Sequence, residues 1–169
     1  MIEIEKVIAI DLEKFEIIRS IAQETWTIAY GEILSTAQLE YMFDMMYSVD
    51  SLLEQAAKKN LQFILAKKGN DYLGFASYEN DIHQTNKTKI HKIYILPETQ
   101  GKGIGKVLID FIAVEAQRQK DIAVVLNVNK YNKAIHFYLK LGFSNVKEEV
   151  IDIGNGYVMD DYVMEKMFE

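Results

Sequence analysis

The fold of this chain is decided by the stretch Tyr94-Ile95-Leu96-Pro97-Glu98-Thr99-Gln100-Gly101-Lys102-Gly103-Ile104-Gly105-Lys106. The run Ile90–Leu96 is short and rich in apolar residues, and Pro97 stops it, which is typical of a strand. After the glycines, apolar residues recur with helical spacing at Ile104, Val107, Leu108, Phe111 and Ile112. The stretch therefore predicts a strand, a glycine turn and a long helix that reaches about Lys120.

Three glycines alternate ahead of this helix, at Gly101, Gly103 and Gly105. Backbone N–H groups at a helix start, together with the helix dipole, favour a phosphate or another anion. The alternative is a tight turn without a ligand, but one glycine would be enough for that. The spacing excludes two common phosphate loops, because Lys106 replaces the third glycine of the dinucleotide pattern and Val107 replaces the Ser or Thr of a Walker loop.

Length and composition limit the class of protein. A chain of 169 residues is long enough for one full hydrophobic core, so we expect a single domain over residues 1–169. The absence of cysteine excludes disulfides, thiolate metal sites and a cysteine nucleophile, and it fits a cytoplasmic protein. We expect no signal peptide and no membrane association, since no apolar run is long enough and the first residues are acidic.

The charge balance bears on the partner. The sequence holds 19 basic and 25 acidic residues, for a net charge of -6. This argues against nucleic acid as a partner and is compatible with a cationic substrate. No metal is expected.

The order of elements predicts an α/β (mixed α+β) fold, with a mixed sheet and helices on both faces. Asp11, the pair Ser35 and Gln38, and the pair Ser51 and Glu54 are candidate helix caps. The turns 68–71 and 154–156 predict hairpins. The expected elements are a strand at 1–9, helices at 11–29, 35–46 and 51–60, strands at 61–67 and 72–78, a loop at 79–87, a strand to 96, a helix to 120, a strand at 122–128, a helix at 131–141, and strands at 143–153 and 157–168.

A second dense stretch runs from Asn127 to Phe143. Its asparagines follow a predicted strand and can place side-chain amides in a crevice. Phe137 and Tyr138 fit the interpretation of core aromatic residues. A tyrosine near the carboxyl ends of two strands has another possible use, since its phenol, with a pKa of about 10, can donate a proton to a leaving group.

Together the two stretches resemble the GNAT superfamily of N-acetyltransferases. The matching pieces are Gln100-x-x-Gly103-x-Gly105, reached through Ile93-Tyr94-Ile95-Leu96-Pro97, and Asn132-x-Ala134-Ile135-x-Phe137-Tyr138-x-x-Leu141-Gly142-Phe143. The resemblance covers residues 60–169 well. The first part fits more loosely, through Trp26-Thr27-x-x-Tyr30-Gly31-x-Ile33-Leu34. The resemblance implies the GNAT fold, a twisted mixed sheet of about six to seven strands with helices on both faces and a cleft between the fourth and fifth strands.

The resemblance also implies a site for acetyl-CoA. The pyrophosphate would lie on the N–H groups of Gln100, Gly101, Lys102, Gly103, Ile104 and Gly105, with Lys106 nearby. The pantetheine arm would pair with the backbone of Ile93 and Ile95, on either side of Tyr94. Asn127 would flank the cleft, and Asn132 would reach the pantetheine or the phosphates. Tyr138 would protonate the departing thiolate.

The general base is less clear from the sequence. Many relatives carry a glutamate on the strand before the loop, and here His91 stands two residues before Ile93. His91 is the candidate base, because strand alternation would place it on one face with Ile93 and Ile95. The alternative is a histidine on a polar strand face beside Lys89 and Lys92.

The expected function is transfer of an acetyl group from acetyl-CoA to a primary amine. Without a cysteine, an acyl-cysteine route is closed, so we expect direct attack in a ternary complex. A polyamine, a protein or peptide amine and a small-molecule amine all remain open, and the chain is also similar to the bacterial branch that acetylates spermidine and spermine. The alternative is a CoA-binding sensor or structural module without turnover, and a homodimer would fit either function.

Residues that could select the amine lie on the first helices and the last strand. The aromatic pair Trp26 and Tyr30 is spaced four apart, so it shares a helix face and could line a pocket or simply pack the helix. The acidic candidates are Glu24, Glu32, Asp44, Asp160 and Asp161.

Overall fold

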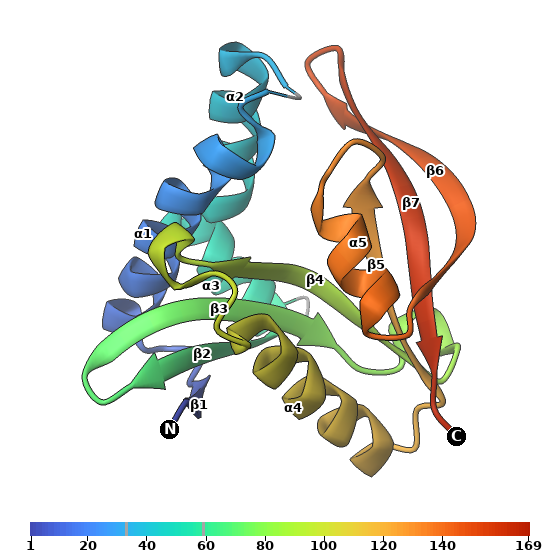
Figure 1. Cartoon of the computed structure of the whole chain (residues 1–169). Helices are drawn as coiled ribbons and strands as arrows, with labels where there is room; N and C mark the ends of the chain where they lie inside the picture. The colour runs from blue at the N-terminus through green and yellow to red at the C-terminus, as the bar shows by residue number, and fades with distance from the viewer. Residues whose placement is uncertain (33, 59) are drawn as a thin grey trace.

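The computed structural model describes residues 1–32, 34–58 and 60–169. Within these ranges the order of strands and α-helices is the expected one, and Figure 1 shows them along the chain. The elements are β1 (Glu3–Val7), α1 (Leu12–Tyr30), α2 (Thr36–Tyr47), α3 (Val49–Lys58), β2 (Gln62–Lys68), β3 (Asp71–Glu79), η1 (Ile82–Gln84), β4 (Lys87–Ile95), η2 (Pro97–Thr99), α4 (Ile104–Arg118), β5 (Ala123–Asn129), α5 (Ala134–Lys140), β6 (Ser144–Gly154) and β7 (Tyr157–Met167).

The strands of the described ranges form one seven-stranded sheet in the order β1-β2-β3-β4-β5-β7-β6. β4 and β5 are parallel, and every other pairing among these strands is antiparallel. The two predicted hairpins join β2 to β3 and β6 to β7. The prediction of a mixed sheet in an α/β fold is therefore confirmed.

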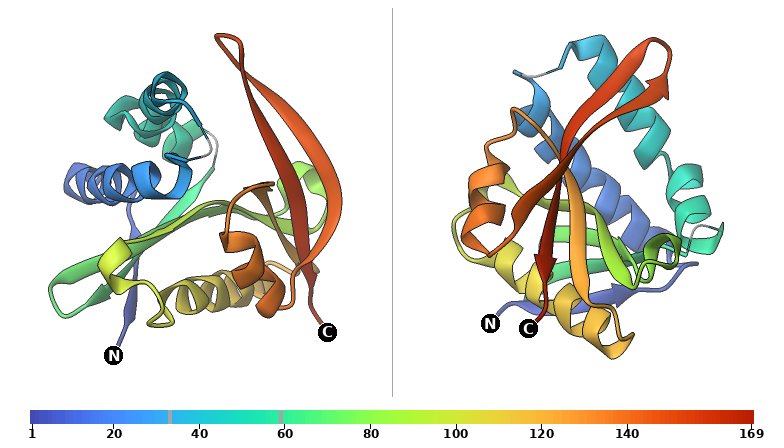
Figure 2. Two further views of the ribbon diagram at one scale, coloured as in Figure 1. Left: turned by 45° about the horizontal axis from the view of Figure 1, so that its top comes forward. Right: turned by 90° about the vertical axis from the view of Figure 1, so that its right-hand side faces the viewer.

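Helices cover both faces of this sheet (Figure 2). On one face, Phe63 and Phe75 pack with Phe15 and other residues of α1 to α3. On the other face, Ile64 packs with Leu108 and other residues of α4. Phe63 and Ile64 are neighbours in the sequence, so the period of two in a strand divides the two cores.

Local hydrogen bonds explain where the helices begin. The carboxylate of Asp11 accepts from the N–H of Lys14 at 3.2 Å, and Ser35 Oγ accepts from the N–H of Gln38 at 3.2 Å, as expected. The third cap is corrected: Ser48 Oγ accepts from the N–H of Ser51 at 3.2 Å. Ser51 therefore lies inside α3, which follows α2 with only Ser48 between them.

The helix expected from Tyr131 is shorter than the sequence suggested and begins at Ala134. Asn129 Oδ1 accepts from the N–H of Tyr131 at 3.0 Å, and Asn132 Oδ1 accepts from the N–H of Ala134 at 2.8 Å. These side chains bind the backbone two residues ahead, which forms turns in place of a first helical turn.

Candidate active site

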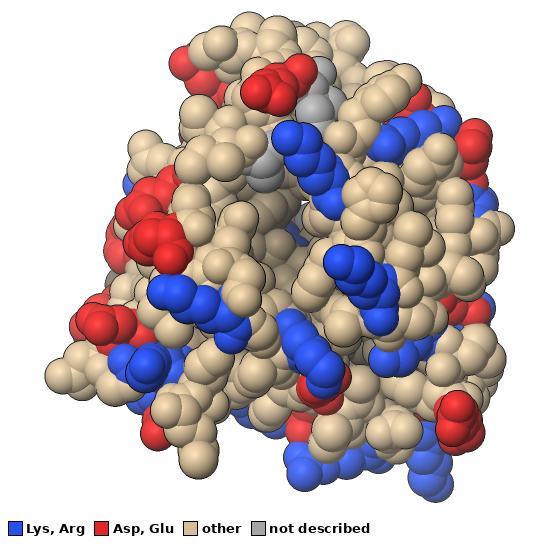
Figure 3. All heavy atoms as spheres, in the orientation of Figure 1, with Lys and Arg blue, Asp and Glu red and all other residues tan. Residues whose placement is uncertain are grey.

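The cleft of this protein begins where two strands part. β4 and β5 pair in parallel only from Lys87 to Ile90 and from Ala123 to Leu126. Beyond these residues β4 continues to Ile95 and β5 to Asn129, with no further pair between them in the described chain. Figure 3 shows a hollow on this face of the molecule, between the side of α1 and α2 and the side of α5 and β7. The predicted cleft between the fourth and fifth strands is confirmed.

The glycine loop lies at the end of β4 and opens α4. Gly101 and Gly103 have φ of +79° and +81°, a left-handed conformation that favours glycine. Gly103 is the N-cap of α4, and no side chain caps the helix there. A Cβ at either glycine would have no heavy atom within 4 Å. The first N–H groups of α4 are therefore open to an anion.

Gly105 has a different role from the other two glycines. A Cβ at this position would lie 2.9 Å from Ile95 Cδ1 and 2.9 Å from Phe137 Cζ. Gly105 therefore lets the first turn of α4 pack closely against β4 and α5. Gly101 and Gly103 therefore leave open space in front of the loop, whereas Gly105 serves packing.

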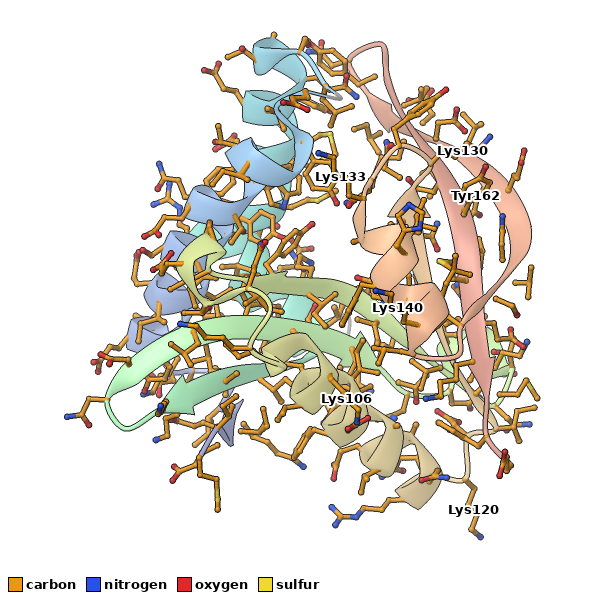
Figure 4. The ribbon with its side chains drawn as sticks, viewed as in Figure 1. Lys106, Lys120, Lys130, Lys133, Lys140 and Tyr162 are labelled. Atoms are coloured by element: carbon orange, nitrogen blue, oxygen red, sulfur yellow. The ribbon has the colours of Figure 1, made fainter. Side chains whose placement is uncertain are left out.

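Several lysines stand around the hollow. Figure 4 labels Lys106 of α4, Lys133 just before α5 and Lys140 of α5, and these lysines lie around the opening seen in Figure 3. Lys106 Nζ is 2.5 Å from Asp110 Oδ2 on the exposed side of α4. Lys102 is exposed in the glycine loop. The mouth of the cleft is thus positively charged, although the chain as a whole is acidic.

Tyr138 lies on α5 and is buried. Its ring packs against Phe137 at 5.3 Å and Phe143 at 5.8 Å between centroids, so the interpretation as a core aromatic residue is correct for the ring. Burial raises the pKa of its phenol, which therefore stays protonated at neutral pH. A neutral phenol has one proton to donate.

A small cavity of about 30 Å³ lies between the helices and the last strands. Residues of α1, α2, β5 and β7 and of the segment before α2 line it: Tyr30, Leu34, Met42, Asn127, Asn129, Val158, Met159 and Asp161. α2 reaches over to the β6–β7 hairpin, since Tyr41 donates to the carbonyl of Ile153 at 2.9 Å and the amide of Gln38 donates to that of Val158 at 3.2 Å. These contacts connect the wall formed by α2 to the wall formed by β7.

Asp161 is the buried acidic group of this cavity, with 1% of its surface exposed. Asn127 Nδ2 lies 3.5 Å from Asp161 Oδ2 and donates to Glu149 Oε2 at 2.9 Å. Asp161 Oδ1 has no hydrogen-bond partner among the described residues. Burial raises the pKa of Asp161, and the charges of Glu149 and Asp160 act in the same direction.

Comparison with known proteins assigns this arrangement to a family. A family model for the acetyltransferase (GNAT) domain matches residues 32–165. This chain belongs to the GNAT acetyltransferase family. A spermidine N(1)-acetyltransferase of Thermoplasma acidophilum is 28% identical over 99% of this chain and 98% of its own length.

Solved structures agree with this assignment. The crystal structure of the PaiA N-acetyltransferase from Thermoplasma acidophilum in complex with coenzyme A superimposes with a TM-score of 0.81, at 25% identity and 99% coverage of both chains. A GCN5-related N-acetyltransferase from Rhodopseudomonas palustris reaches the same TM-score at 17% identity, over 98% of this chain and 95% of its own, and shows the fold alone.

The structure of the acetyltransferase places His91 at a β-bulge. Ser77 pairs with Lys92 and Tyr78 pairs with Ile90, which leaves His91 as an extra residue in β4. Ile90 and Ile93 consequently belong to the same core although they are three residues apart. The expectation that His91 alternates in register with Ile93 and Ile95 is therefore wrong. His91 Nε2 lies 3.1 Å from Glu79 Oε2.

The aromatic candidates of the first helix occupy two different places. Trp26 is buried among the rings of Tyr30, Tyr47 and Tyr94, so it packs the helix. Tyr30 lines the cavity, and its hydroxyl is 3.2 Å from that of Tyr94. Burial raises the pKa of both phenols. Ile33, part of the same sequence pattern, lies outside the described residues.

The remaining acidic candidates, Glu24, Glu32 and Asp44, have exposed side chains. In the described part of the chain no group of three His, Cys, Asp or Glu residues could hold a metal ion. No helix within the described ranges combines the length and apolar character needed to cross a membrane.

Proposed function

We propose that this acetyltransferase moves the acetyl group of acetyl-CoA to a primary amine by direct attack while both substrates are bound. One observation carries the proposal: the parting of β4 and β5 leads directly to the open N-terminus of α4. Open strand edges and a positively charged helix start therefore meet in one cleft, and CoA combines amide groups with phosphates.

The chain offers a matching contact for each part of this cosubstrate. The N–H groups from Gln100 to Gly105 would hold the pyrophosphate, because Gly101 and Gly103 leave the approach clear of side chains. Beyond Ile90 the edge of β4 is unpaired toward β5, so the backbone of Ile93 and Ile95 can pair with the pantetheine amides. The amide of Asn132, close to the hydroxyl of Tyr30, would lie beside the same arm.

Acetyl-CoA supplies an activated acyl group, and the chain must manage the protons. An alkyl amine with a pKa of about 10.4 costs about 4 kcal/mol to present as a neutral nucleophile at pH 7.4. A group of this chain must therefore accept a proton from the amine. Tyr138 is the proposed donor to the departing sulfur, since its phenol is kept neutral by burial. His91 is the acceptor that the sequence proposes.

The acceptor class follows from charge and from one relative. The relative named as a spermidine N(1)-acetyltransferase matches almost the whole of this chain. The net charge of -6 and the acidic cavity suit a cationic amine. We therefore propose an alkyl amine of the polyamine class as the acceptor.

The test is an assay of free CoA released from acetyl-CoA in the presence of spermidine, an alanine-terminated peptide or an aminoglycoside. Release that depends on spermidine, with acetylspermidine found by mass spectrometry, supports the proposal. Release only with the peptide or the aminoglycoside refutes the polyamine assignment. No release with any amine, combined with a raised melting temperature in acetyl-CoA, identifies a CoA-binding sensor instead.

A further inference from the structure

The buried carboxylate of Asp161 is not explained by the packing around it. One oxygen, Oδ1, has no hydrogen-bond partner in the described chain, and the other has only a long contact of 3.5 Å with Asn127 Nδ2. Leaving a buried charge without partners costs several kcal/mol. Of the residues that line the cavity, Asp161 is the one with such a buried unpartnered atom.

The neighbouring Asp160 shows what a structural aspartate looks like on the same strand. Its Oδ1 lies 3.0 Å from Lys130 Nζ, and 42% of its side chain is exposed. The two residues are adjacent on β7, so their side chains point to opposite faces of the sheet. Asp160 Oδ1, like Asp161 Oδ1, accepts no hydrogen bond from the described residues, but it has the ammonium of Lys130 beside it, whereas Asp161 forms no ion pair within the described part of the chain.

The groups around Asp161 make the cavity attractive to a cation. Glu149 of β6 and Asp160 of β7 add negative charge, and Lys89 of β4 offsets part of it. Tyr30 of α1 faces the cavity with a phenol that burial keeps neutral. Asn127 donates to Glu149 at 2.9 Å and reaches Asp161 Oδ2 only at 3.5 Å, so a donor from a ligand could bind Asp161 Oδ1 without displacing a shorter bond.

A primary ammonium ion fits these requirements. It carries one positive charge and three N–H donors, and it can satisfy the free oxygen of a buried carboxylate. The position is also suitable for chemistry. Asp161 pairs with Asn129 at the end of β5, beyond the point where β4 and β5 part, so it borders the cleft proposed for the thioester.

We propose that Asp161, rather than His91, binds the ammonium group of the acceptor and takes a proton from it, which frees the nitrogen lone pair for the attack. The inference rests on the acetyl transfer proposed above. The nitrogen lone pair forms the N–C bond, the C–S bond breaks, and its electron pair leaves with the sulfur. The nitrogen loses two protons in all. One proton passes to Asp161 and then to solvent. The other replaces the proton that Tyr138 gives to the sulfur, so that Tyr138 ends the reaction protonated.

The experiment compares Asp161→Asn with Glu148→Gln, which removes an exposed carboxylate of β6 that lies 3.2 Å from Lys130 Nζ. Amine kinetics are measured with spermidine and n-butylamine, and n-butylamine binding to the CoA-loaded protein is measured by calorimetry. For Asp161→Asn we expect amine affinity and kcat/KM to fall by at least about 30-fold, the smallest loss typical of breaking a buried charge pair. For Glu148→Gln the change should stay within about threefold, because an exposed ion pair contributes little.

Two readouts separate this role from a general loss of structure. The rise in melting temperature caused by acetyl-CoA should be unchanged in both variants. An aromatic amine, which is neutral at the assay pH, should lose much less rate than n-butylamine in Asp161→Asn. Butylammonium binding that is absent from the wild type, or equal in the wild type and Asp161→Asn, overturns the inference. Binding that depends on Asp161 without any acetylation supports the cation site and refutes only the proposed reaction.

Discussion

Substitution of Gly103 by alanine tests the phosphate loop most directly. Gly103 has φ of +81° and ψ of 6°, and a Cβ there would meet no heavy atom within 4 Å. The methyl group thus causes no clash in the free protein and costs only the left-handed backbone conformation, about 1 kcal/mol. The same methyl group would project into the region proposed for the pyrophosphate.

The expected size of the effect follows from mass action. At a concentration of 100 times Kd, a ligand stabilises the folded state by about 2.7 kcal/mol. For a chain of this length each kcal/mol shifts Tm by about 2–4 °C, so acetyl-CoA should raise the wild-type Tm by about 5–11 °C. Losing one N–H bond to a charged phosphate costs about 1.5–3 kcal/mol, or about 10- to 160-fold in Kd, and a loss of about 100-fold is taken from the upper part of this range. The same ligand concentration would then stabilise the variant by only about 0.4 kcal/mol, or about 1–2 °C.

Gly69→Ala provides the matched control. Gly69 has φ of +62°, and a Cβ there would also meet nothing within 4 Å, but it lies in the turn between β2 and β3. Both variants should lose about 1 kcal/mol of stability without ligand. Differential scanning fluorimetry with and without acetyl-CoA should show a full ligand shift for Gly69→Ala and almost none for Gly103→Ala. A full shift in Gly103→Ala would refute the assignment of this loop to the pyrophosphate.

Three further predictions follow from single side chains. Tyr138→Phe should lower kcat by about 10²–10⁴-fold while leaving the acetyl-CoA shift intact, and wild-type turnover would place the acid elsewhere. Asp161→Asn should raise Tm at pH 7 and lose that advantage near pH 3. Burial raises the pKa of the Asp161 carboxyl above its ordinary 3.8, so the stability of the wild type falls as pH rises through the raised value. A lower Tm of the variant at pH 7 would contradict this. Glu5→Gln should lower the free energy of unfolding by less than about 1 kcal/mol at pH 7 and leave it unchanged at pH 3. Lys67 and Lys14 lower the pKa of Glu5, and the stability that these ion pairs provide is lost when Glu5 is protonated. Equal denaturation midpoints of variant and wild type at pH 7 would show that the ion pairs contribute nothing.

Much of the fold could be predicted because local signals and global architecture agree. Apolar periodicity, the caps at Asp11 and Ser35 and the turn at Gly69 each depend on residues close in sequence. The glycine loop could be located for the same reason, since Gly103 and the first turn of α4 are contiguous. What the sequence could not show is that Gly105 serves packing, because Phe137 approaches it from another helix.

The candidate base illustrates the limit of strand alternation. His91 looked favourable because it stands two residues before Ile93, but the bulge at Ser77 and Tyr78 shifts the register between them. A bulge depends on the partner strand, so no local pattern in β4 reveals it. Asp161 could be named only as one of several acidic candidates. Its burial became evident from the register that sets Asn129 opposite it.

The single parallel pairing among the described strands would allow one cleft to hold both proposed substrates. In parallel strands the carboxyl ends lie at the same edge, and each of β4 and β5 is followed there by a helix, α4 or α5. α4 brings an open N-terminus for phosphate, and α5 brings Tyr138. β7 lies antiparallel to β5 and adds Asp161 from the opposite chain direction. In the proposed reaction the anion of one substrate and the cation of the other would therefore be drawn to separate walls, and the thioester and the amine would meet in the gap between β4 and β5.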